Sequence, residues 1–152
     1  MTGLRGYAVD MTAPTTHFPT AGTELEGDLM LPVGAHGVVL FAHGSGSSRH
    51  SPRNRQVAAE LTRHRLGTLL VDLLTHEEEV DDARTRDLRF DIGLLADRLI
   101  GLVDWLSGRP ETRSLPVGLF GASTGAAAAL VAAAARPHHV PDDSDSRPGI
   151  AA

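Results

Sequence analysis

Residues 117–125, Val-Gly-Leu-Phe-Gly-Ala-Ser-Thr-Gly, decide the fold that we expect for this chain. A short apolar strand runs directly into the pattern Gly-x-Ser-x-Gly, and an alanine-rich helix follows over residues 126–135. Such a tight strand-to-helix turn leaves almost no room for side chains two positions before and after the serine, and Gly121 and Gly125 meet that requirement. The turn is predicted to expose the hydroxyl of Ser123 at the carboxyl edge of a parallel sheet, as in a nucleophile elbow.

Two further apolar runs, over residues 38–42 and 68–71, are bounded by glycine and show no polar alternation. Runs of this kind are typical of parallel strands that are covered on both faces. The run over residues 115–120 is a third. We therefore predict an α/β fold with a mostly parallel sheet flanked by helices, in three layers (αβα).

Two amphipathic helices are predicted to connect these strands. The first begins at the N-cap Ser51 with Pro52 in the first helical position, and the second runs from Asp91 to Gly108 with apolar residues at steps of three and four. The residues that the first helix turns inward are Val57, Ala58 and Leu61. Each helix forms the crossover of a βαβ unit.

Three remaining segments carry weaker signals. Residues 23–31 alternate polar and apolar side chains, which favours a half-exposed strand at the edge of the sheet. Residues 75–89 are charged and poor in apolar side chains, so we expect an excursion loop that overhangs the carboxyl ends of the strands. Residues 137–152 have no periodicity and are predicted to be a disordered tail, which leaves one domain over residues 1–136.

The composition argues against several classes of function. The formal net charge is −5 and Lys and Arg are not clustered, so we expect no nucleic-acid partner and no anionic membrane surface as a partner. Cysteine is absent, which excludes disulfides, thiolate metal sites and cysteine nucleophiles. The histidines lack metal-ligand spacing, so no metal is predicted. The N-terminus does not read as a signal peptide and no run approaches about 20 apolar residues, so we expect a soluble, cytoplasmic protein.

A glycine-rich segment over residues 43–48, His-Gly-Ser-Gly-Ser-Ser, follows the strand at residues 38–42. It is predicted to project backbone N–H groups toward the serine on the neighbouring strand, with the amides of Ser45 and Thr124 as oxyanion-hole donors. Such donors contribute about 3 to 4 kcal/mol each to a developing oxyanion. We place His43 and Gly44 in contact with substrate. The alternative is that the segment is only a flexible connection between a strand and a helix.

The two motifs at this separation resemble the α/β-hydrolase fold, specifically the dienelactone hydrolase-like group with serine as the nucleophile. The resemblance covers residues 23–136. It implies hydrolysis of esters or related acyl compounds through an acyl-enzyme, without a cofactor. By that resemblance Ser123 is the nucleophile and a small-molecule ester or acyl compound is the substrate.

The chain departs from this family beyond the elbow helix, because no residue matches the catalytic acid or histidine that family members carry on later strands. His138 and His139 follow a helix of about thirteen residues, which places them roughly 20 Å from Ser123. His76 lies at the correct edge, but within a charged stretch, and Asp72 is better suited to anchoring a loop. We therefore expect an incomplete α/β-hydrolase fold, a chain that reads as truncated, with impaired turnover.

Three further expectations follow from the same residues. In the family the elbow strand is central, so residues 116–120 are expected to form an exposed apolar edge that invites self-association. A non-catalytic scaffold or binding module would need the same two glycines for the turn. An anion or phosphate binder would use residues 44–48 with Arg49, Arg53 or Arg55, although no P-loop lysine is present.

Overall fold

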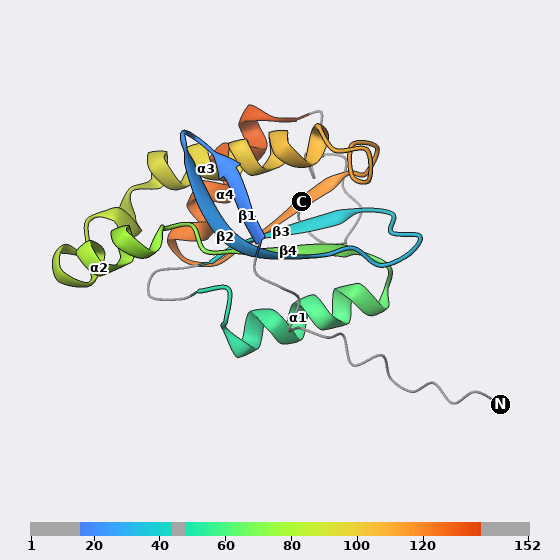
Figure 1. Cartoon of the computed structure of the whole chain (residues 1–152), viewed down its shortest axis with the longest axis horizontal. Helices are drawn as coiled ribbons and strands as arrows, with labels where there is room; N and C mark the ends of the chain where they lie inside the picture. Colours follow the sequence, from blue (N-terminus) through green and yellow to red (C-terminus); the bar gives the residue numbers. More distant parts are fainter. Residues whose placement is uncertain (1–15, 44–47, 138–152) are drawn as a thin grey trace.

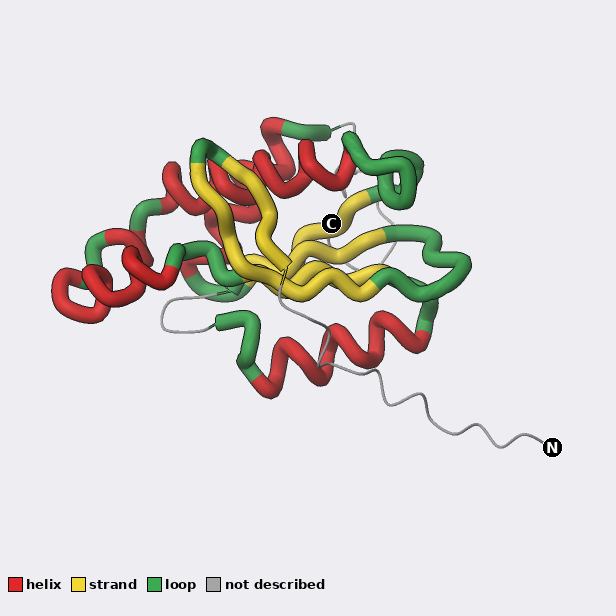
Figure 2. The backbone as a smooth tube through the Cα atoms, in the orientation of Figure 1, coloured by secondary structure: helices red, strands yellow, loops and turns green. Residues whose placement is uncertain are grey.

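Five strands form one mixed sheet with helices on both faces (Figures 1 and 2). The computed structural model describes residues 16–43 and 48–137. The strands are β1 (Thr16–Thr20), β2 (Thr23–Met30), β3 (Val38–Ala42), β4 (Gly67–Val71) and β5 (Val117–Gly121), in the spatial order β1-β2-β4-β3-β5. The helices are α1 (Pro52–Arg63), α2 (His76–Thr85), α3 (Ile92–Ser107) and α4 (Thr124–Ala135), with a short 3₁₀ helix at Leu88–Phe90.

Strands β4, β3 and β5 are parallel, which confirms the predicted βαβ units. Helix α1 covers one face of the sheet, and helices α3 and α4 cover the other (Figure 1). Ser51 caps α1, as predicted, and Asp91 caps α3 at the point where that helix was predicted to begin. The predicted three-layer αβα architecture is therefore present.

Strand β2 is not the edge strand that the sequence predicted. Strand β1 pairs antiparallel with its outer side through a two-residue turn, Ala21-Gly22, in which both residues have positive φ (46° and 78°). Phe18 of β1 is fully buried and its ring packs edge-on against Trp105 at 4.8 Å. Strand β1 was not predicted, because Phe18 is its single large apolar residue and is surrounded by Pro19 and polar residues, so the strand shows no apolar periodicity.

The segment predicted as a charged loop, residues 75–89, contains helix α2. The Thr75 hydroxyl accepts the Glu78 N–H (3.2 Å), and the Glu78 carboxylate accepts the Thr75 N–H (2.9 Å), which completes a capping box. The Thr-x-x-Glu pattern was present in the sequence as a helix signal. Capping thus makes a helix from residues that bury little apolar surface.

An ion pair fastens α2 to α3. Arg98 of α3 is buried and donates from Nη1 and Nη2 to the two carboxylate oxygens of Glu78, at 2.7 and 2.8 Å. Its Nη1 also donates to the carbonyl of Leu73 at 2.7 Å. A bidentate pair of this kind is stronger than a surface salt bridge, so it fixes the start of α2 above the carboxyl end of β4.

Two further expectations concern the C-terminal tail and membrane-spanning segments. Residues 138–152 lie outside the described residues, so the disordered tail and the domain limits stay predictions. None of the helices in the described part of the chain is both long enough and apolar enough to cross a membrane.

The Glu78–Arg98 pair predicts a specific dependence of stability on pH. Burial raises the pKa of Glu78, but hydrogen bonds from Arg98 and Thr75 and the charge of Arg98 outweigh burial and lower it below the ordinary value of 4.5. A carboxyl group with a lowered native pKa stabilises the fold above its unfolded pKa, and this contribution disappears as the pH falls through the native pKa. Glu78→Gln should therefore lower the free energy of unfolding at neutral pH, by an amount that shrinks below about pH 4.5.

Chemical denaturation of both chains across that pH range measures the difference. Glu77→Gln, at an exposed position in the same helical turn, is the matched control. A cost of Glu78→Gln that stays constant from neutral to acid pH would contradict the assigned ion pair.

Candidate active site

Ser123 joins β5 to α4 in a backbone conformation that is rare for a residue with a side chain. Its φ is 57° and its ψ is −130°. Non-glycine residues in such regions cost about 1 to 3 kcal/mol and persist where the surrounding structure enforces them. The Ser123 side chain is exposed, so the turn holds its hydroxyl at the surface, as the sequence predicted.

The two glycines of the motif are required by close backbone approach. A Cβ atom at Gly125 would lie 2.2 Å from the carbonyl oxygen of Ala42 and 2.5 Å from that of His43. A Cβ atom at Gly121 would lie 2.7 Å from the Gly125 carbonyl oxygen. The start of α4 therefore rests directly on the end of β3, and this contact sets the sharpness of the turn.

Of the two predicted oxyanion donors, only Thr124 lies among the described residues. Thr124 is the first residue of α4 and directly follows Ser123, so its amide lies at the N-terminus of the helix. Ser45 and Gly44 fall outside the described residues. The roles of these residues stay predictions.

His43 connects the ends of two parallel strands. Its Nε2 accepts the backbone N–H of Leu73 at 2.9 Å, so this nitrogen is unprotonated and the imidazole ties the residue after β3 to the residues after β4. The bond gives His43 a structural role. Contact between His43 and a substrate stays a prediction.

Asp72, next to Leu73, anchors the other end of the glycine-rich segment. Its Oδ1 accepts the Arg49 backbone N–H at 2.7 Å, and its Oδ2 pairs with the Arg49 guanidinium. Arg49 is buried and also faces Glu26 (3.3 Å) and Asp28 (3.7 Å). Asp72 thus anchors a loop, which was the expected use of this residue.

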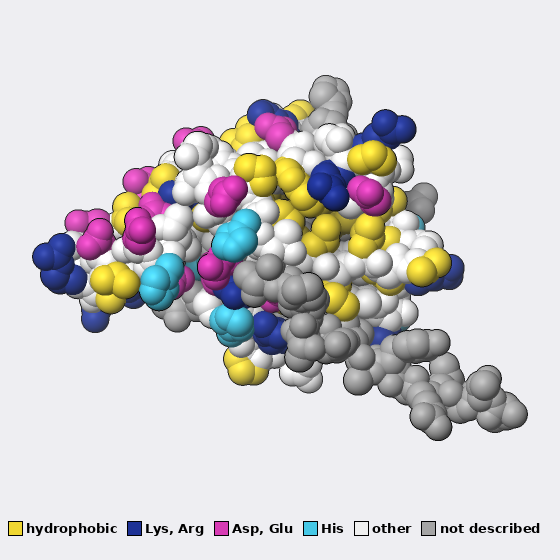
Figure 3. Space-filling view, viewed as in Figure 1, with side chains coloured by type: hydrophobic (Ala, Val, Ile, Leu, Met, Phe, Trp, Pro, Cys, Tyr) yellow, Lys and Arg dark blue, Asp and Glu magenta, His cyan; other side chains and the backbone are white. Residues whose placement is uncertain are grey.

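An open cleft of about 860 Å³ lies beside these anchors. Carboxylates and histidines dominate its walls, and Figure 3 shows such side chains gathered next to α2. The acidic and histidine residues in its lining are His17, Glu24, Glu26, His50, Asp72, His76, Glu77, Glu78 and Glu79. Ser123 does not line this cleft, so the cleft adjoins the β4 end of the sheet rather than the elbow.

Glu79 of α2 lines the same acidic cleft. Partial burial and the nearby charge of Asp72 raise the pKa of Glu79, while the charges of His76 and Arg49 act in the opposite direction. This cleft was not predicted from the sequence, because its walls combine the glutamates at residues 77–79 with residues from distant segments. Within residues 16–43 and 48–137, no group of three or more acidic or histidine side chains is arranged to hold a metal ion.

Known proteins show where this arrangement recurs. The solved structure of dienelactone hydrolase from Anabaena variabilis is 61% identical to this chain, with a TM-score of 0.80, over 83% of this chain and 58% of that one. The chain has the α/β-hydrolase fold. The esterase Pf2001 of Pyrococcus furiosus, at 20% identity and a TM-score of 0.63, shares the fold over 83% of this chain and 47% of its own.

A curated relative of this chain bears a different name. A protein of Mycobacterium tuberculosis strain H37Rv, provisionally named as a phosphoribosyl transferase, is 62% identical over 108 residues. That match covers 71% of this chain and 24% of the relative. This chain therefore spans about a quarter of the curated relative and somewhat more than half of the dienelactone hydrolase. No family model matches the chain.

The described histidines that line the acidic cleft do not face the elbow, because Ser123 is not part of that lining. His76 is the first residue of α2, is exposed and lines the acidic cleft with His17 and His50. His138 and His139 lie outside the described residues. Within residues 16–43 and 48–137, no histidine makes a hydrogen bond to the Ser123 hydroxyl.

The contact between α4 and β3 predicts the effect of adding one methyl group. Gly125→Ala should lower the free energy of unfolding by about 1 to 3 kcal/mol, or by enough to prevent folding, because its Cβ would overlap two backbone carbonyl oxygens. Thermal and urea unfolding measure this loss.

Gly118→Ala is the control, since a Cβ there meets nothing closer than 3.8 Å. It should leave stability unchanged or raise it slightly. Equal effects of the two substitutions would show that the close approach at the elbow is not what fixes Gly125.

Proposed function

We propose that this α/β-hydrolase cleaves esters or related acyl compounds, with Ser123 as the covalent nucleophile. The observation that carries the proposal is the exposed serine, with a positive φ, in the turn between β5 and α4. The 61% identity with a dienelactone hydrolase supports the same chemistry. Both the strain at Ser123 and the required glycines fit a residue that must stand clear of the sheet edge.

The reaction would begin with attack of the Ser123 Oγ on the acyl carbonyl carbon. The new C–O bond turns the carbonyl oxygen into an oxyanion, which the amides of Ser45 and Thr124 would stabilise. Collapse of this intermediate breaks the ester C–O bond and leaves an acyl-serine, and the alkoxide departs as the alcohol with a proton equivalent to the one that the Ser123 hydroxyl released to water on attack. Water then attacks the acyl-serine, releases the carboxylic acid and restores Ser123.

The rate depends on a base that the described residues do not supply. An oxyanion hole and substrate binding without a working triad leave a rate enhancement of roughly 10³ to 10⁴ over water. We therefore expect acylation of Ser123 to be measurable but slow in this chain. A small-molecule ester or acyl compound is the proposed substrate class.

The structure weakens the anion-binding alternative. Arg49 already faces Glu26, Asp28 and Asp72, and Arg55 pairs with Asp28 at 3.4 Å. The neighbouring cleft is lined mainly by carboxylates, which repel phosphate. For the same reason we do not propose phosphoribosyl transfer, the activity in the name of the mycobacterial relative, for this site; the chain covers a quarter of that relative.

A fluorophosphonate probe tests the nucleophile directly. The purified chain should form a covalent adduct at Ser123, located by peptide mass spectrometry, and Ser123→Ala should remove it. Ser114→Ala, which changes another exposed serine shortly before β5, should label like the unchanged chain.

Thermal unfolding of each variant must first show that it is folded. A folded chain without an adduct, or equal labelling of Ser123→Ala, would refute the proposed nucleophile. The first outcome would favour the non-catalytic scaffold.

A further inference from the structure

The side chain of His43 supplies a hydrogen bond beyond the point where the sheet ends. The parallel pairing of β3 and β4 ends at Phe41 and Leu70, so the backbone groups after β4 need other partners. Leu73 is fully buried, and its N–H donates to the Nε2 of His43 at 2.9 Å. A buried N–H without an acceptor is costly. The imidazole therefore continues the connection between β3 and β4 past the last backbone pair.

The backbone of His43 faces the elbow. Its carbonyl oxygen would lie 2.5 Å from a Cβ atom at Gly125, and the Ala42 carbonyl accepts the Ala122 N–H at 3.4 Å. Ala122 precedes Ser123 in the chain, and Gly125 follows it by two residues. Residue 43 is thus held between the end of β4 and the turn that presents the serine, so a shift of this residue affects both.

The direction of the hydrogen bond fixes the protonation state of the imidazole. A backbone N–H can only donate, so the Nε2 of His43 is unprotonated and the neutral ring carries its proton on Nδ1. A second proton, on Nε2, would set two N–H groups against each other and break the bond to Leu73. Histidine is the side chain that ordinarily changes charge between pH 5 and 8. With Nε2 engaged and Nδ1 protonated, His43 has no basic nitrogen to offer Ser123, so it is not the missing base.

The charged groups around His43 belong to the β4 and α2 side of the site. Glu79 of α2 lies within electrostatic reach of His43. The same carboxylate interacts with the charges of Asp72, His76 and Arg49. Strands β3 and β5 and helix α4, which meet at the elbow, contain no titratable residue. In the described part of the chain, the elbow side therefore has no titrating group of its own, and acid acts on it only through neighbouring residues such as His43.

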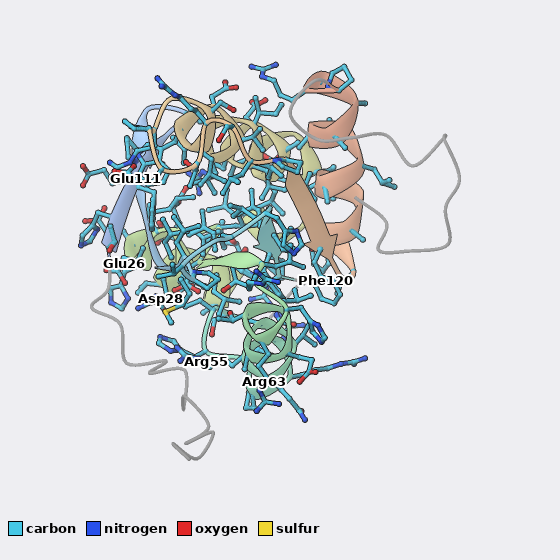
Figure 4. The ribbon with its side chains drawn as sticks, turned by 90° about the vertical axis from the view of Figure 1, so that its right-hand side faces the viewer. Glu26, Asp28, Arg55, Arg63, Glu111 and Phe120 are labelled. Carbon is cyan, nitrogen blue, oxygen red and sulfur yellow. The ribbon has the colours of Figure 1, made fainter. Side chains whose placement is uncertain are left out.

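The carboxylates of β2 are further from the elbow. Figure 4 shows Glu26 and Asp28 at one side of the sheet and Phe120, near the end of β5, at the other side beside α4. Both carboxylates face the Arg49 guanidinium, at 3.3 and 3.7 Å. Their interactions are therefore with Arg49 and not with the residues of the turn.

We propose that His43 is a positioning residue for Ser123, and that its neutral imidazole holds the end of β3 in place against the elbow. Proton uptake by the ring releases the Leu73 N–H, shifts the His43 carbonyl relative to Gly125 and loosens the turn at Ser123. The inference rests on the proposed function where it concerns the reactivity of Ser123, whereas the coupling of the imidazole to the elbow can be measured without any reaction.

Two amide substitutions at residue 43 test this role. In His43→Gln the side-chain oxygen reaches the position of Nε2, accepts the Leu73 N–H and does not titrate. In His43→Asn it reaches only the position of Nδ1, so the bond is lost at every pH. His76→Gln is the control, because it removes a different, exposed imidazole that also acts on Glu79. Thermal unfolding must show that each chain is folded at the pH of the measurement.

The rate constant of fluorophosphonate labelling at Ser123 is measured from about pH 8 to about pH 5. At the upper limit His43→Gln should react within about twofold of the unchanged chain, and His43→Asn about tenfold more slowly. At the lower limit the unchanged chain should react at about a tenth of the rate of His43→Gln. This ratio cancels the effects of groups that titrate alike in both chains. The ratio of His76→Gln to the unchanged chain should not change with pH.

Nuclear magnetic resonance follows the same coupling in the absence of a reaction. The ring nitrogen shifts of His43 should show the proton on Nδ1 near pH 8. The protection factors of the Leu73 and Ala122 amides should fall at least about fivefold near pH 5 in the unchanged chain and not in His43→Gln. If no chain is labelled, the proposed nucleophile is refuted, and the Ala122 amide alone decides whether His43 positions the elbow.

Three results would overturn the proposal. One is a neutral ring with its proton on Nε2, which could not accept the Leu73 N–H. Another is labelling in which the ratio of His43→Gln to the unchanged chain stays the same from neutral to acid pH. The third is equal protection of the Ala122 amide in these two chains at acid pH.

Discussion

The contact between Gly125 and the carbonyl oxygens of Ala42 and His43 is the constraint on which the site depends. It brings the first turn of α4 against the end of β3, and the chain can make that approach only by turning sharply at Ser123. The strain of the positive φ at Ser123 is offset by burial of the alanine face of α4 against the sheet and α3. Exposure of the hydroxyl is thus a consequence of helix packing.

The carboxyl end of β4 organises the other side of the site. Asp72 and Leu73 are consecutive, and they bond to Arg49 and His43, which flank the glycine-rich segment. Both ends of that segment are therefore fixed to the same two residues. Arg98 extends the arrangement by joining the Leu73 carbonyl to Glu78 of α2. These hydrogen bonds and ion pairs connect the residues after β4 to helices α2 and α3 and to both sides of the glycine-rich segment.

Much of this fold could be predicted from the sequence. Buried strands, helix starts and the sharp turn at Ser123 each require particular residues close together in the chain, and these appear as continuous apolar runs, helix caps and paired glycines. The interpretation of residues 75–89 as a loop was wrong, since apolar content alone ignored the capping box at Thr75 and Glu78. The edge position expected for residues 23–31 was wrong because β1 buries only Phe18 and carries little periodic signal. The acidic cleft depends on contacts between distant segments, which no local pattern reveals.

Pre-steady-state kinetics with p-nitrophenyl acetate test most directly whether Ser123 forms an acyl-enzyme. An initial phase that releases about one equivalent of p-nitrophenolate per chain should be slow but should precede a still slower turnover, and Ser123→Ala should abolish this initial phase. That result is expected if packing of α4 on β3 presents a reactive serine. A linear time course that is identical in the two chains would contradict it, and would leave the elbow as a packing feature without catalytic use.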